Sequence, residues 1–267
     1  MTSGLVSVSF RQLPATEIIS LAKQAGLRGI EWGGDVHVPY GDLQIAESVG
    51  KATREAGLDV VAYGSYYRLG DSEGLQFETV ADTAVFLSAP VIRVWAGRKG
   101  SADADETYWK AVCDDALRCA DIAASRGLLI AYEYHSATLT DTLETTLRLL
   151  DATQHPAIRT LWQYIPGLSV EENLRHLRAL LPWLQHIHAF YWLNDFFHRH
   201  PMSEGHADWV QYIRTIRETG KECPVLLEFV RDDDPSVLSG EAAALEKIFA
   251  EAWNCIAQKV SHRSAEI

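Results

Sequence analysis

The sequence predicts an α/β fold, a single (β/α)8 barrel that spans residues 1–267. Short apolar runs alternate with helix-like stretches, and the runs begin about every 30 residues, the length of one βα unit. The length of 267 residues matches the roughly 250 residues of such a barrel. No Gly/Ser-rich linker and no change in composition divides the chain. An open, doubly wound sheet is the alternative, but Gly33-Gly34 after the second run lacks the glycine pattern of a phosphate-binding turn.

Eight apolar runs are the predicted strands of this barrel. Several of them are continuously apolar, as expected for parallel strands that are covered on both faces. The predicted strands are Leu5–Phe10, Arg28–Gly33, Asp59–Tyr67, Val91–Gly97, Leu128–His135, Ile158–Tyr164, His186–Trp192 and Pro224–Val230.

The segments between these runs carry the signals of helices. Ala15–Gln24 and Asp105–Arg126 are amphipathic, and a glycine follows closely after each, as is common at helix C-termini. Ser169 has a glutamate three residues further on, which predicts a capping box at the start of a helix. Asp234 is followed by a proline, and this pair predicts the start of the last helix.

Composition and charge exclude several classes of protein. Apolar residues make up 47% of the chain and charged residues 22%, so a large core is expected. The net charge of −12, without a Lys/Arg-rich run, argues against a nucleic-acid partner. No apolar run is long enough to span a membrane, and no signal peptide is expected. The four cysteines show no CxxC pairing, which is typical of free thiols in a reducing compartment. We therefore expect a cytoplasmic protein, and the sequence leaves a homo-oligomer possible.

Four of the predicted strands end in a residue that can hold a metal ion. These residues are Glu133, Gln163, His188 and Glu228. The C-terminal ends of neighbouring parallel strands converge on one point above a barrel. Two carboxylates, one imidazole and one amide oxygen gathered there would form a site for one divalent metal ion. Such ligands suit Mn, Mg, Co or Zn, and do not suit Cu or an iron–sulfur cluster.

Glu133 and Glu228 both lie within apolar stretches of their strands. Burial would push an unpaired carboxylate towards its neutral form, whereas a bound cation keeps it ionised. The alternative for either glutamate alone is a buried salt bridge to Arg93 or Arg28.

His186 and His188 are two residues apart, so both point to the same face of one strand. If that face is the barrel interior, only the residue nearer the C-terminal end of the strand reaches the mouth. We therefore predict that His188 is the metal ligand and that His186 is a structural residue deeper in the barrel.

Further residues at the strand ends are predicted to contact a substrate. Aromatic faces stack on the C–H side of sugar or cyclitol rings, although ordinary packing is the alternative for each aromatic residue. Glu31 and His135 are expected either to support a ligand or to contact the substrate. The loop Asn194–Gly205 is a candidate lid, with a solvated loop as the simpler interpretation. The predicted contacts are Glu31, Trp32, Tyr63, Arg93, Trp95, His135, Trp162, Trp192 and Arg199.

Several motifs together resemble a known family over nearly the whole chain. They are GLRGIEWGG after the first helix, IRVWAG, LLIAYEYH, HIHAF, and EGHADWVQYIRTIRETG leading to VLLEF. With these motifs the sequence resembles the xylose isomerase-like TIM barrel superfamily of sugar and sugar-phosphate isomerases and epimerases. The last block is the most specific, because a Gly…Asp-Trp turn, a helix and a strand ending in glutamate recur together in that group.

The resemblance implies one divalent ion held by Glu133, the residue on the sixth strand, His188 and Glu228. It also implies that the two glutamates act as an acid/base pair on opposite faces of a sugar, through an enediolate that the metal stabilises. The family usually has an aspartate on the sixth strand, often with a histidine three residues further on. This chain has Gln163 and then Pro166. A glutamine can coordinate through its carbonyl oxygen, but it removes one negative charge.

We therefore predict a metal-dependent isomerase or epimerase of a sugar or sugar-like polyol, in which Glu133 and Glu228 are catalytic. The alternatives are a non-catalytic sugar-binding barrel that has lost its metal, or a related lyase or dehydratase. An endonuclease-like phosphodiesterase of the same group would need several zinc ions and more histidines at the strand ends. The sequence leaves open which sugar is used, whether it is phosphorylated, and which metal is native.

Overall fold

Eight parallel strands close into a barrel, which confirms the predicted (β/α)8 fold. The protein's computed structural model describes residues 1–193 and 198–265, with side chains described as far as Asn254. Around the barrel the strands follow the order β1-β10-β7-β6-β5-β4-β3-β2. Their bounds are β1 Thr2–Val6, β2 Gly29–Gly33, β3 Asp59–Arg68, β4 Val91–Trp95, β5 Leu129–Tyr132, β6 Ile158–Trp162, β7 Leu184–Ala189 and β10 Pro224–Leu227.

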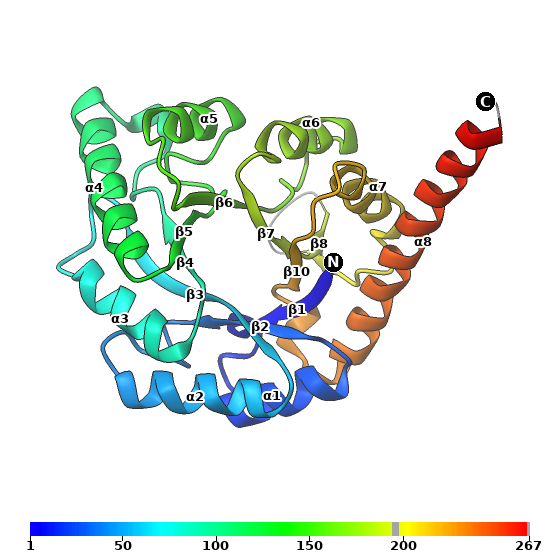
Figure 1. Cartoon of the computed structure of the whole chain (residues 1–267), viewed down its shortest axis with the longest axis horizontal. Helices are drawn as coiled ribbons and strands as arrows, with labels where there is room; N and C mark the ends of the chain where they lie inside the picture. The colour runs from blue at the N-terminus through cyan, green and yellow to red at the C-terminus, as the bar shows by residue number, and fades with distance from the viewer. Residues whose placement is uncertain (194–197, 266–267) are drawn as a thin grey trace.

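Helices surround the strands, and the last helix is the longest (Figure 1). A short antiparallel hairpin of β8 (Tyr191–Trp192) and β9 (Arg199–His200) stands apart from the barrel. The helices are α1 Ala15–Gln24, α2 Leu43–Glu55, α3 Phe77–Leu87, α4 Glu106–Ser125, α5 Leu143–Ala152, α6 Val170–Leu180, α7 His206–Arg217 and α8 Leu238–Ala265.

The residues predicted from the sequence to begin helices are found at the starts of helices in the structure. α1 has the predicted bounds, and Asp105 caps α4 by accepting a hydrogen bond from a backbone N–H. Ser169 and Glu172 form the predicted capping box at the start of α6. Asp234 caps a short 3-10 helix, Pro235–Val237, that leads directly into α8.

The observed strands differ from the predicted ones in one or both bounds, and the first and seventh strands differ most. The first strand was expected at Leu5–Phe10, but β1 ends at Val6 and a 3-10 turn follows. Ser7 and Ser9 of this turn alternate with apolar residues, as side chains do in a half-buried strand. Their hydroxyls instead accept hydrogen bonds from the backbone N–H groups of Gly33 and Phe229. The seventh strand was expected to reach Trp192, but β7 ends at Ala189 and the last two residues form β8.

Apolar side chains fill two separate regions. The larger cluster lies between the strands and the helices, where successive strands bury their outward faces. A smaller cluster includes Ala62, Ala131 and Leu226. No helix in the described part of the chain combines the length and apolar character that a membrane span requires. Cys113, Cys119 and Cys223 are free thiols, and the side chain of Cys255 lies outside the described residues.

Replacing Gly50 with alanine should destabilise the protein, because Gly50 lies in α2 where the end of α3 approaches closely. A Cβ atom there would lie 2.2 Å from the carbonyl oxygen of Leu87, which is backbone and cannot easily move. We expect a loss of about 1–3 kcal/mol in the free energy of unfolding, measured with urea. Gly240→Ala in α8 is the matched control, since a Cβ atom there meets nothing within 4 Å, and it should change stability by less than about 1 kcal/mol. Equal effects of the two variants would contradict this account of the α2–α3 contact.

Candidate metal centre and pocket

A pocket of about 400 Å³ opens where the strands end. Its walls are mainly aromatic, and its polar residues come from the ends of several strands. The aromatic side chains are Tyr66, Trp95, Tyr134, Tyr164, Phe190, Trp192 and Phe229. The charged and polar side chains are Arg11, Arg93, Glu133, His135, Ser136, Thr140, Asp141, Gln163 and Glu228.

The four predicted metal ligands lie at this end of the barrel. Glu133, Gln163 and Glu228 directly follow β5, β6 and β10 and line the pocket, and His188 lies in β7. Glu133, His188 and Glu228 offer ligand atoms that all lie within 4.8 Å of one another. The three side chains are almost fully buried. The ligand atoms of Glu133, His188 and Glu228 therefore lie together, and Gln163 lines the same pocket.

Two buried polar atoms in this group have no hydrogen-bond partner, and both belong to predicted ligands. They are Oε1 of Gln163 and Nδ1 of His188. The other end of the Gln163 amide is held, since Nε2 donates to the carbonyl oxygen of Tyr134 at 2.9 Å. Buried polar atoms normally have partners, so two unpaired atoms of ligand type in one place fit a bound cation.

The buried charges around the centre also fit one divalent cation. Glu31, Glu133 and Glu228 are three buried carboxylates, and Arg93 is the one buried guanidinium that contacts this group in the described residues. With both histidines neutral, as coordination by His188 requires, two negative charges remain uncompensated, and one divalent ion would balance them. Isolated buried charges are costly, so this balance favours occupancy by such an ion.

Arg93 links two of the carboxylates inside the barrel. Its Nε lies 2.8 Å from Oε1 of Glu31, and its Nη1 donates to Oε2 of Glu133, which also accepts from Nε1 of Trp95. Burial alone would lower the pKa of Arg93 and raise the pKa of each glutamate. The mutual attraction outweighs this effect, so the pKa of Arg93 lies well above its usual range and those of Glu31 and Glu133 lie below theirs. The salt bridge to Arg93 considered as an alternative for Glu133 is therefore present, beside the group of candidate ligands.

His188 lies between two carboxylates. Its Nε2 is 3.0 Å from Oε2 of Glu31, and its Nδ1 is 3.3 Å from Oε2 of Glu228. Burial alone would lower the pKa of His188, but Glu228 and Glu31 raise it to about 10. His186 is one layer deeper, as predicted, and burial lowers its pKa.

Three of the aromatic residues predicted to contact a substrate lie outside the pocket, and this is a correction. Trp32, Tyr63 and Trp162 are fully buried on the outer side of their strands. Trp32 donates to Thr53 of α2, Tyr63 donates to a backbone carbonyl, and Trp162 packs on Trp209 of α7. Successive residues of a strand face opposite sides, so these side chains belong to the layer between barrel and helices.

Of the other predicted substrate contacts, one lies below the pocket and four line it. Glu31 lies below the pocket and supports His188 and Arg93. Trp95 and His135 line the pocket and stack on each other, with ring centroids 4.9 Å apart. Trp192 and Arg93 also line it.

Arg199 lies beside the pocket wall and not in it. Its guanidinium carbon is 5.6 Å from the ring centroid of Trp192 and 5.1 Å from that of Phe229. It also pairs with Asp233 at 2.6 Å. Arg199 lies in the candidate lid loop Asn194–Gly205, of which residues 194–197 lie outside the described part of the chain.

Several residues that line the pocket were not among the predicted contacts, and Tyr66, Phe229 and Arg11 are three of them. Tyr66 and Phe229 line the pocket with φ angles of 57° and 49°, a left-handed conformation that is unfavourable for aromatic residues. Arg11 donates to the Tyr66 hydroxyl at 2.7 Å and pairs with Asp35 at 2.5 Å. A first strand that ends at Val6 would have placed Arg11 in a βα loop, but no sequence signal reveals the two strained aromatic residues.

Comparison of the sequence with known protein families identifies the class of protein to which this barrel, with its candidate metal centre at the strand ends, belongs. The chain belongs to the xylose isomerase-like TIM barrel family, whose model matches residues 19–253. The resemblance seen in the sequence is thereby confirmed.

Individual relatives include lyases and isomerases. The 3-dehydroshikimate dehydratase of Bacillus anthracis is 27% identical over 203 residues, which cover 70% of this chain and 71% of that protein. The crystal structure of the probable 3-DHS dehydratase AsbF from Bacillus anthracis has a TM-score of 0.75 and 24% identity, over 92% of this chain and 99% of that one. L-ribulose 3-epimerase has a TM-score of 0.74 and 14% identity, over 97% and 98% of the two chains.

A further structure in this group contains a metal ion. It is a xylose isomerase-like TIM barrel protein from Mycobacterium smegmatis in complex with magnesium, with a TM-score of 0.71 and 14% identity over 94% of this chain and 97% of that one. At identities this low, the solved structures show a shared fold.

Metal binding at neutral pH should release about one proton per ion, and this proton should come from His188. The pKa of about 10 means that the metal-free imidazole is protonated near pH 7.5, and a metal can bind only to a deprotonated nitrogen. Apparent affinity should therefore fall as pH falls, by roughly tenfold per pH unit below pH 10. Calorimetry of Mn²⁺ binding in buffers of different ionisation enthalpy measures the proton count. His188→Gln is the control and should release none, whereas release of no proton by the unmodified protein would contradict the assignment.

Proposed function

We propose that this protein is a divalent-metal-dependent enzyme that moves a proton at a carbon next to a carbonyl group of a small polyhydroxylated substrate. The observation that carries this proposal is the convergence of Glu133, His188 and Glu228, whose ligand atoms lie within 4.8 Å of one another, beside a pocket that Gln163 also lines. These four residues would hold the ion. A bound divalent ion supplies charge that polarises a substrate carbonyl and acidifies the neighbouring C–H bond.

The two glutamates have different surroundings, and we assign them different roles. Oε2 of Glu133 accepts from both Arg93 and Trp95, which keeps this carboxylate ionised and oriented and makes it a weak base. Oε2 of Glu228 instead pairs with Nδ1 of His188, at 3.3 Å, and the hydrogen bonds of Arg93 and Trp95 go to Glu133. Glu228 is therefore the better proton acceptor. This proposal narrows the prediction that both glutamates act as acid/base residues.

His135 is a second acid/base group in the pocket. Its Nδ1 lies 2.6 Å from the carbonyl oxygen of Ser136, so this nitrogen carries a hydrogen and Nε2 is left to accept or donate a proton. The ring stacks on Trp95, which fixes its plane against the pocket wall. Glu228 and His135 would thus form a pair, one to remove a proton and one to deliver it.

We propose that the substrate is not phosphorylated. Both arginines that line the pocket are already paired, Arg11 with Asp35 and Arg93 with Glu31 and Glu133. A phosphate group needs a cation or a helix N-terminus that is free to receive it. The aromatic walls instead suit the apolar face of a sugar or cyclic polyol.

Two reactions share the proposed first step. Returning the proton to carbon gives the isomerase or epimerase predicted from the sequence. Delivering it to a leaving hydroxyl group gives a dehydratase, and the similarity to the 3-dehydroshikimate dehydratase of Bacillus anthracis favours this second reaction.

An assay of the metal-loaded protein on ketoses, inososes and 3-dehydroshikimate in D₂O should separate the two reactions. An isomerase or epimerase exchanges the substrate proton for deuterium and releases no water, whereas a dehydratase gives a product lighter by one water. Activity should disappear after chelation and return with one equivalent of Mn²⁺ or Mg²⁺ per chain. A purified protein that takes up no metal would contradict the proposal and favour the non-catalytic sugar-binding barrel.

Glu228→Gln should lower kcat by about 10²–10⁴-fold, because the amide keeps the shape of the side chain but cannot accept the proton. The fold should remain intact in circular dichroism and thermal melting. Glu171→Gln is the matched control, since Glu171 is exposed on α6, outside the pocket, and pairs only with Arg178. Unchanged turnover of Glu228→Gln would contradict the role of Glu228.

A further inference from the structure

Two groups of possible metal ligands share one imidazole. Glu133, His188 and Glu228 form the upper group, next to the pocket. Glu31, His186 and His188 form a lower group, inside the barrel. The ligand atoms of each group lie within 4.8 Å of one another, so distance alone does not decide which group binds an ion.

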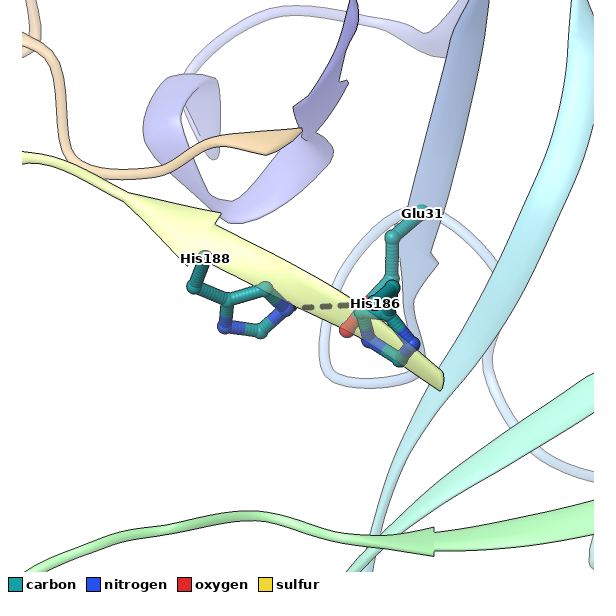
Figure 2. Close-up of side chains that lie close together, drawn as sticks. All are labelled: Glu31, His186 and His188. Carbon is teal, nitrogen blue, oxygen red and sulfur yellow. Dashed lines mark hydrogen bonds and ion pairs between the residues drawn. The ribbon is translucent and has the colours of Figure 1, made fainter. Parts of the chain in front are cut away.

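The two nitrogens of His188 face the two groups separately. Nε2 makes a hydrogen bond of 3.0 Å to Oε2 of Glu31, and Nδ1 lies 3.3 Å from Glu228 without a hydrogen-bond partner. Figure 2 shows Glu31 pointing from β2 towards the histidines of β7. An ionised carboxylate can only accept, so Nε2 must carry the hydrogen of this bond.

The lower group is a poor cation site. Glu31, His186 and His188 are fully buried, and none of them lines the pocket, so a substrate cannot reach an ion held there. The guanidinium of Arg93 already lies 2.8 Å from Oε1 of Glu31 and would repel a second cation. The upper group has Gln163, with an unpaired oxygen, as a fourth candidate ligand, whereas the unpaired atoms of the lower group belong to Glu31 and His186 themselves, and Oε1 of Glu31 already faces Arg93.

We propose that Glu31 is a positioning residue for the metal centre. By accepting the Nε2 hydrogen of His188, it fixes the tautomer and the ring orientation that present Nδ1 to an ion held with Glu133 and Glu228. A carboxylate that holds the far side of a ligating imidazole is a recurrent device in metal proteins. This inference rests on the proposed metal-dependent function.

Glu31 is itself held in place from three sides. Arg93 pairs with its Oε1, and Nε2 of His186 approaches its Oε2 at 3.0 Å, without the alignment of a hydrogen bond. Gly64 of β3 packs against the ion pair, since a Cβ atom there would lie 2.6 Å from Nη2 of Arg93 and 3.0 Å from Oε1 of Glu31. Because Gly64 has no side chain, the ion pair of Arg93 and Glu31 can occupy this space.

The first test compares the affinity of two variants for Mn²⁺, measured by the electron spin resonance signal of the free ion. Glu31→Gln keeps the size of the side chain but loses the charge that holds the Nε2 hydrogen, and affinity should fall by about 10–100-fold. Glu241→Gln is the matched control, because it makes the same change in a buried carboxylate of α8 that belongs to neither group of candidate ligands and accepts a hydrogen bond from the backbone N–H of Met202. It should change affinity by less than about threefold on the same scale.

The second test reads the tautomer directly in the unmodified protein, so it does not depend on the folding of a variant. Long-range ¹H–¹⁵N spectra of the ¹⁵N-histidine-labelled chain with one equivalent of Zn²⁺ should show the hydrogen of His188 on Nε2 and the ion on Nδ1. A hydrogen on Nδ1, or Mn²⁺ affinity of Glu31→Gln equal to that of the unmodified protein, would overturn the role of Glu31 while leaving the metal centre in place. Failure of the unmodified protein to bind either ion would overturn the proposed function, and this inference with it.

Discussion

The ion pair that Arg93 shares between Glu31 and Glu133 is the interaction on which the rest of the site depends. It lies inside the barrel, where a carboxylate without a partner would be driven to its neutral form. One guanidinium keeps both glutamates charged and fixes their positions. Through Glu31 it also reaches His188, so a single buried cation connects two of the candidate metal ligands. Removing one member of such a pair typically costs about 3–5 kcal/mol, because its partner is left as an uncompensated buried charge.

Much of this arrangement could be predicted from residues that are close in the sequence. The ends of parallel strands meet at one edge, so the sequence predicts that Glu133, Gln163 and Glu228 lie close together. Strand alternation placed His186 and His188 on one face and in the right vertical order. The predicted positions of Trp32, Tyr63 and Trp162 are wrong because they conflict with the same alternation of side chains along a strand. Trp32 directly follows Glu31, and neighbouring residues of a strand cannot both face the interior.

The rest of the site could not be predicted from the sequence, because it depends on contacts between distant parts of the chain and on irregular backbone conformations. The pairing of Arg93 with Glu31 joins β4 to β2, and the sequence only offers Arg93 as one of several candidates. Phe229 faces the pocket because its backbone adopts a positive φ angle just after β10, which an apolar run does not reveal. The role of Ser7 and Ser9 after β1 could not be predicted for the same reason, because their hydrogen-bond partners, Gly33 and Phe229, lie far away in the sequence.

The glutamine on the sixth strand follows from the same charge balance. The family usually has an aspartate at this position, and an aspartate here would add a third uncompensated negative charge to a group that one divalent ion already balances. The amide of Gln163 also donates to the carbonyl oxygen of Tyr134, which a carboxylate would repel. Its Oε1 is left buried and unpaired at the pocket floor. The departure from the family pattern therefore removes a charge but keeps an oxygen atom of a type that can coordinate a metal ion.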